Sequence, residues 1–121
     1  MWDEELILPL DACLRVHIEN EGKEPWATKG ANVKFAVFWV PNQLTLDEFL
    51  RGIKEKKLGD GKDVTEFFEN GNGGWTKGST CKGGEKEGGK GKRLLGGKGG
   101  LGWDARGMGM TSKAVWIKPS K

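Results

Sequence analysis

The sequence predicts one domain of the α+β class. Within the first 41 residues, one segment alternates apolar with polar side chains, as a half-buried strand does, and a second strand-like segment becomes apolar on both faces; an amphipathic segment with a helix-capping signal follows them. The chain then closes with another β-rich run. A chain of 121 residues normally folds as a single domain, so we treat residues 1–121 as one unit.

The first predicted strand is CLRVHIENEG, in which Leu14, Val16 and Ile18 form one apolar face and His17 lies on the other. The second is ANVKFAVFWVP, which becomes apolar on both faces after Lys34, as a central or partly covered strand would. Pro41 lacks a backbone N–H and should end it. These two strands are adjacent along the chain and predict a hairpin.

The segment TLDEFLRGIKEKKLGDG predicts the main helix. Thr45 and Glu48 have the spacing of a capping box, and Gly59 should end the element. Its apolar face comprises Leu46, Phe49, Leu50 and Ile53. A shorter piece, DVTEFFENG, repeats the capping relation with Asp63 and Glu66 and predicts one or two helical turns.

The second half of the chain is rich in glycine and lysine. Residues 71–102 hold 14 of the 21 glycines, and neither periodicity persists there, so residues 71–112 are predicted to be a flexible loop region. Residues 1–70 carry 9 Lys/Arg and 14 Asp/Glu, whereas residues 71–121 carry 11 and 3. A basic half suggests an acidic partner such as nucleic acid, contact with the acidic half, or a solvated loop.

The final segment, SKAVWIKPSK, predicts a short strand beside the first one. A hairpin, a helix across it and a returning strand resemble the ubiquitin-like β-grasp over residues 12–58 and 113–119. The alternative is a ferredoxin-like or other small α+β sandwich. The resemblance implies a noncatalytic protein-interaction module with a protein partner.

The segment LLGGKGGLG resembles the processing junction of the silencing-defective-two family, in which a ubiquitin-like domain is cut after a double glycine. The resemblance covers Leu95 to Gly100 and implies a cut after Gly97. The candidate processing residues are Gly96, Gly97 and Lys98. If the final strand joins the sheet, however, this cut would nick the domain and would not release it.

The same region suggests nucleic-acid binding, because Lys and Arg bind phosphates and indole rings stack on bases. The candidate contact residues are Trp75, Lys77, Lys82, Lys90, Lys92, Arg93, Lys98 and Trp103. Trp39 and Trp116 are expected in the core instead.

We expect no catalysis, cofactor or metal. Gly97, Gly99 and Gly102 match a dinucleotide fingerprint, but no amphipathic helix follows them. Cys13 and His17 share a strand face at about 13 Å, too far for a nucleophile pair. With neither a signal peptide nor a membrane-spanning run, we expect a soluble cytoplasmic or nuclear protein that does not bind membranes; its oligomeric state is left open.

Overall fold

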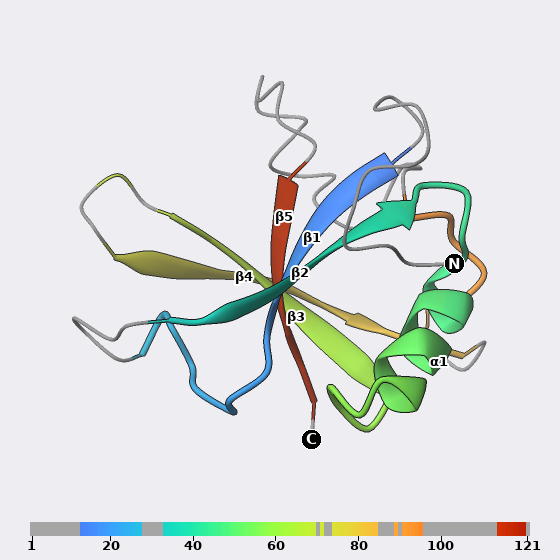
Figure 1. The fold of residues 1–121 in the computed structure, drawn as a ribbon, viewed down its shortest axis with the longest axis horizontal. Helices are drawn as coiled ribbons and strands as arrows, with labels where there is room; N and C mark the ends of the chain where they lie inside the picture. Colours follow the sequence, from blue (N-terminus) through green and yellow to red (C-terminus); the bar gives the residue numbers. More distant parts are fainter. Residues whose placement is uncertain are drawn as a thin grey trace.

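The computed structural model describes residues 13–27, 33–69, 71, 74–84, 89, 91–95 and 114–120. The elements, in chain order, are β1 (Cys13–Glu19), β2 (Phe35–Pro41), α1 (Leu46–Glu55), β3 (Asp63–Glu69), β4 (Trp75–Lys82) and β5 (Ala114–Pro119). The five strands form one mixed sheet in the order β2-β1-β5-β3-β4 (Figure 1). Only β1 and β5 are parallel; the other neighbours are antiparallel.

The predicted fold class is wrong. The described residues hold one helix of 10 residues beside five strands of six to eight residues, so the molecule is a mixed sheet with one short helix. It is not a clear α+β β-grasp with a main helix, and the α+β sandwich alternative falls with it. The error has a local origin, because the residues of β3 were assigned to helix and those of β4 to loop.

β3 shows why the short helical prediction failed. Asp63 and Glu66 have capping spacing, but β3 pairs with β4 on one side and β5 on the other. Val64 is completely buried in this arrangement, and Phe67 is nearly so. Two strand partners and two buried side chains outweigh a weak local preference for a helical turn.

The other predicted strands and the helix are present. However, α1 ends at Glu55, with Lys56 as its C-cap and Lys57 in the left-handed conformation, and not at Gly59 as predicted. The two early strands pair over their whole length, and the final strand lies beside the first, as expected. At the start of α1, the Glu48 amide donates to Thr45 Oγ1 at 3.2 Å and the Thr45 amide donates to Glu48 Oε1 at 3.1 Å, which completes the capping box. Beyond its end, the Leu58 amide donates to the Ile53 carbonyl at 3.0 Å.

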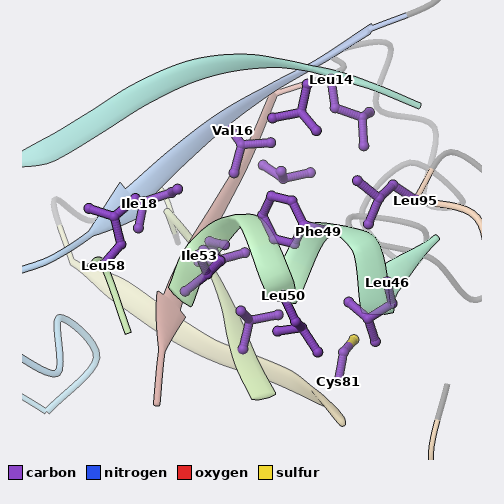
Figure 2. Close-up of a cluster of buried hydrophobic side chains, with 14 residues drawn as sticks. Leu14, Val16, Ile18, Leu46, Phe49, Leu50, Ile53, Leu58, Cys81 and Leu95 are labelled. Carbon is purple, nitrogen blue, oxygen red and sulfur yellow. The ribbon is translucent and has the colours of Figure 1, made fainter. Parts of the chain in front are cut away.

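The main core lies between α1 and one face of the sheet. Phe49 lies in the middle of the cluster, with Ile18 and Leu58 toward one end and Leu46 and Leu95 toward the other (Figure 2). Leu14, Val16 and Ile18 are buried, which confirms the predicted inner face of the first strand. Alternation then places the odd-numbered side chains of β1 on the opposite face, which α1 does not cover.

Part of the predicted loop region is built into this core. β4 occupies its beginning, and Leu95 is 1% exposed among the core side chains. The segment leading to Leu95 runs beside the start of α1, where the Leu46 amide donates to the Arg93 carbonyl and the Asp47 amide to the Gly91 carbonyl. Gly91 in this segment therefore lies against the helix.

Candidate binding surface on the helix-free face

Aromatic side chains from all five strands meet on the sheet face opposite α1. We call the set His17, Trp26, Phe35, Phe67, Trp75 and Trp116 the aromatic face. Trp26 comes from the connection between β1 and β2, and each of the others comes from a different strand. Alternation explains the placement, because each strand's inner-face neighbours, such as Val16, Val64 and Val115, belong to the main core.

Phe67 is the centre of the aromatic face. Its ring centroid lies 5.1 Å from that of Trp75, 5.8 Å from that of Trp26 and 6.1 Å from that of Phe35. Phe67 is only 2% exposed, whereas the rings around it are half-buried. The surrounding rings are therefore held in place by Phe67 while part of each still meets solvent.

His17 and Trp116 extend the aromatic face across β1 and β5. Their rings are stacked, with centroids 4.9 Å apart and planes 17° apart, and His17 meets Phe35 edge-on at 5.9 Å. Trp116 also contacts Trp75 at 6.0 Å. The stacked rings of His17 and Trp116 thus connect the β2 end of this sheet face with its β4 end, and the aromatic surface is continuous.

His17 is held in an uncharged form by its surroundings. Burial lowers the pKa of its imidazole below the ordinary value of 6.5; a hydrogen bond with the Val115 carbonyl opposes this shift, and the nearby Arg15 adds to it. Nδ1 lies 3.2 Å from that carbonyl oxygen, so the neutral ring donates from Nδ1. An uncharged ring packs readily against Trp116.

Two cations lie over rings on this side of the sheet. Lys77 Nζ is 5.7 Å from the centre of the Trp26 ring, and Arg15 Cζ is 6.0 Å from that of Trp39. Such cation–π contacts hold positive charge next to exposed aromatic carbon. Lys118 stands two residues after Trp116, and Lys77 stands two residues after Trp75, so each lysine is near a ring of the aromatic face on its own strand.

Acidic groups also belong to this face. Glu69 is opposite Trp75 in the sheet register and is exposed. Glu19 is 1% exposed; its Oε1 accepts a hydrogen bond from the Glu21 amide at 2.6 Å, while Oε2 has no hydrogen-bond partner among the described residues. Because Glu19 is enclosed, the accessible charge near the rings is mainly that of the lysine and arginine side chains.

The structure divides the predicted nucleic-acid residues into separate groups. Trp75 and Lys77 belong to β4 and reach the aromatic face, and Lys82 ends the same strand. Lys92 and Arg93 instead lie beside the start of α1, because the Arg93 carbonyl accepts from Leu46. Outside the described residues lie Lys90, Lys98 and Trp103, together with the candidate processing residues Gly96 and Gly97.

Sequence reasoning missed most of the aromatic face. Trp116 was expected in the core, and His17, Phe35 and Phe67 were given no binding role. Alternation in β2 could have predicted part of it: Ala36, Phe38 and Val40 pack toward α1, so the odd-numbered side chains of β2 lie on the opposite face.

Among the described residues, no group of three or more His, Cys, Asp or Glu side chains is placed to hold a metal ion. Cys13 and Cys81 are both buried. No helix in the described part of the chain has the length and apolar character needed to span a membrane. Comparisons with models of protein families, with curated proteins and with solved structures gave no match.

Proposed function

We propose that this chain is a noncatalytic binding module whose aromatic face binds single-stranded nucleic acid. The observation that carries the proposal is the pairing of half-buried rings with cations: Lys77 lies over Trp26, next to Trp75 and Phe67. Proteins that bind single-stranded nucleic acid use aromatic rings to stack on the bases and cations to contact the phosphates.

The geometry favours single strands over duplexes. The rings lie on a sheet surface, where unstacked bases can reach them, whereas bases inside a duplex are already stacked on one another. Each base stacked on an aromatic side chain contributes about 1–3 kcal/mol, so two or three stacked bases suffice for measurable binding. Residues 71–121, with 11 Lys/Arg against 3 Asp/Glu, supply further attraction for phosphates.

Fluorescence anisotropy with labelled oligothymidine, oligouridine and a DNA duplex tests this proposal. We expect binding of the single strands, weakening as salt is raised, and about 5- to 150-fold weaker binding by Trp75→Leu, which removes a stacking ring worth about 1–3 kcal/mol. Lys77→Gln should lower the salt slope by about 0.7. Lys54→Gln, on an exposed helix position, is the matched control for loss of one charge.

A protein partner is the second candidate, as the sequence led us to expect. It is favoured by the mutual packing of the rings, which presents a joint apolar surface flanked by Arg15, and Trp, Phe and Arg are enriched in protein interfaces. If no oligonucleotide binds at low salt, or if Trp75→Leu and Lys54→Gln bind alike, the nucleic-acid proposal fails and the protein partner takes its place.

Processing after Gly97 and a cytoplasmic or nuclear location stay predictions. β5 lies between β1 and β3, in the middle of the sheet. A cut after Gly97 would leave this central strand on the C-terminal fragment, so the domain would be nicked within its sheet.

A further inference from the structure

Two pairs of a cation and a ring lie at different places on the helix-free side of the sheet. The first, Lys77 over Trp26, belongs to the proposed nucleic-acid site. The second is Arg15 on β1, whose guanidinium carbon lies 6.0 Å from the centre of the Trp39 ring on β2. Arg15 and Trp39 are direct partners in the antiparallel register, so the sheet itself holds this second pair together.

The guanidinium group of Arg15 is available to an anionic ligand. Arg15 is exposed and forms no ion pair with a carboxylate in the described part of the chain. Its cross-strand neighbours are Trp39 on one side and Ala114 on the other, and neither carries a charge. A guanidinium group over a ring still presents N–H donors at its edge, in the fork that matches phosphate oxygens.

Trp39 supplies an indole ring beside this cation. It is half-buried and does not belong to the main core cluster, where the sequence placed it. An indole with a solvent-exposed part can stack on a nucleobase, and a neighbouring arginine adds a cation–π contribution. Arg15 and Trp39 thus repeat, on the other side of the sheet, the combination of ring and cation on which the proposed function rests.

A row of aromatic rings lies between the two pairs. His17 stands two residues after Arg15 on β1, and its ring stacks on that of Trp116 with centroids 4.9 Å apart. Trp116 contacts Trp75 at 6.0 Å, and Trp75 contacts Phe67 at 5.1 Å. Phe67 in turn lies against the indole ring of the first pair. Bases of a strand that reached from one cation to the other would therefore pass over aromatic carbon.

We propose that Arg15 and Trp39 form a second nucleotide subsite, and that one nucleic-acid single strand crosses the sheet from Lys77 on β4 to Arg15 on β1. This inference rests on the proposed function and adds to it the path and the length of the bound strand.

The sheet order sets the length of nucleic acid that this path requires. β3 and β5 lie between β4 and β1. Three strand spacings of about 4.8 Å separate the two backbones by about 14 Å along the sheet. A nucleic-acid strand at helical spacing advances about 3.4 Å per nucleotide, so about five nucleotides reach from one cation to the other. A hexanucleotide is therefore long enough to occupy both subsites.

Binding of labelled hexathymidylate, followed by fluorescence anisotropy over a salt series, tests the second subsite. We expect one strand per chain, and Arg15→Gln should lower the salt slope by about 0.7, as the loss of one phosphate contact does. Arg15→Gln combined with Lys77→Gln should lower the slope by about 1.4, because both cations contact the same strand. Trp39→Leu should weaken binding about 5- to 150-fold. Arg51→Gln, at an exposed position on α1, is the matched control and should leave the slope unchanged.

The indole N–H resonances of the wild type in NMR spectra locate the bound strand independently of any loss of binding by a variant. On addition of hexathymidylate, the resonances of both Trp39 and Trp75 should shift, each assigned with its Trp39→Phe or Trp75→Phe variant. A shift of Trp75 alone, an unchanged salt slope for Arg15→Gln, or two strands per chain would overturn the second subsite and leave the proposed function in place. If the wild type binds no hexathymidylate at low salt, the proposed function itself fails, and the second subsite with it.

Discussion

Gly91 lies directly beneath the side chain of Asp47, the second residue of α1. A Cβ added at Gly91 would overlap the Asp47 carboxylate. The same carboxylate accepts a hydrogen bond from the Gly84 amide at 2.8 Å, and the Asp47 amide donates to the Gly91 carbonyl at 2.9 Å. Gly91→Ala therefore tests whether this glycine is needed for close approach to the helix.

The expected cost follows from the bonds that must give way. The Asp47 side chain has to rotate, which breaks its hydrogen bond with Gly84, and the backbone bond between Asp47 and Gly91 is displaced. Each intramolecular hydrogen bond contributes about 1 kcal/mol net, and the solvent exposure of the hydrogen bond between Gly84 and Asp47 argues against a larger value for this charged bond. Gly91→Ala should therefore lower the free energy of unfolding by about 2 kcal/mol.

Urea unfolding followed by tryptophan fluorescence measures this difference, and a double-mutant cycle assigns it. In an Asp47→Ala background the overlapping carboxylate is gone, so Gly91→Ala should cost less than about 0.5 kcal/mol. The reasoning is refuted if Gly91→Ala changes stability by less than about 0.5 kcal/mol in the wild type, or if its cost is the same in both backgrounds. The first result would mean that the segment around Gly91 can move away from α1 at little cost in free energy.

Three further predictions concern single positions. Lys57 has a φ of +59° just after α1, a left-handed conformation that is strained for lysine but not for glycine, so Lys57→Gly should raise the free energy of unfolding by about 0.5–1 kcal/mol in urea titrations. A lower free energy of unfolding would contradict the presence of this strain. Burial lowers the pKa of His17, so the unfolded chain binds its proton more tightly and stability should fall as the pH drops below 6.5; His17→Phe should lack this His17 contribution in unfolding curves measured across pH. Glu19→Gln keeps an acceptor for the Glu21 amide and relieves the burial of an unpaired carboxylate oxygen, so thermal and urea unfolding should show a gain of about 1 kcal/mol, and a destabilised variant would show that Glu19 has a partner.

Local signals accounted for α1, β1, β2 and β5. Thr45 and Glu48 mark a helix start whichever way the rest of the chain folds, because a capping box involves only neighbouring residues. Alternation in β1 and the apolar run of β5 are similarly local. The sequence by itself determined these elements.

Tertiary structure alone decided β3, β4 and the composition of the aromatic face. Asp63 and Glu66 favour a helical turn locally, and Gly78 weakens a strand, but pairing energy across the sheet overrides both preferences. His17, Phe67 and Trp116 are far apart along the chain and meet because β5 returns between β1 and β3. Which rings share a face depends on strand order and register, and these are set by contacts that no short stretch of sequence contains.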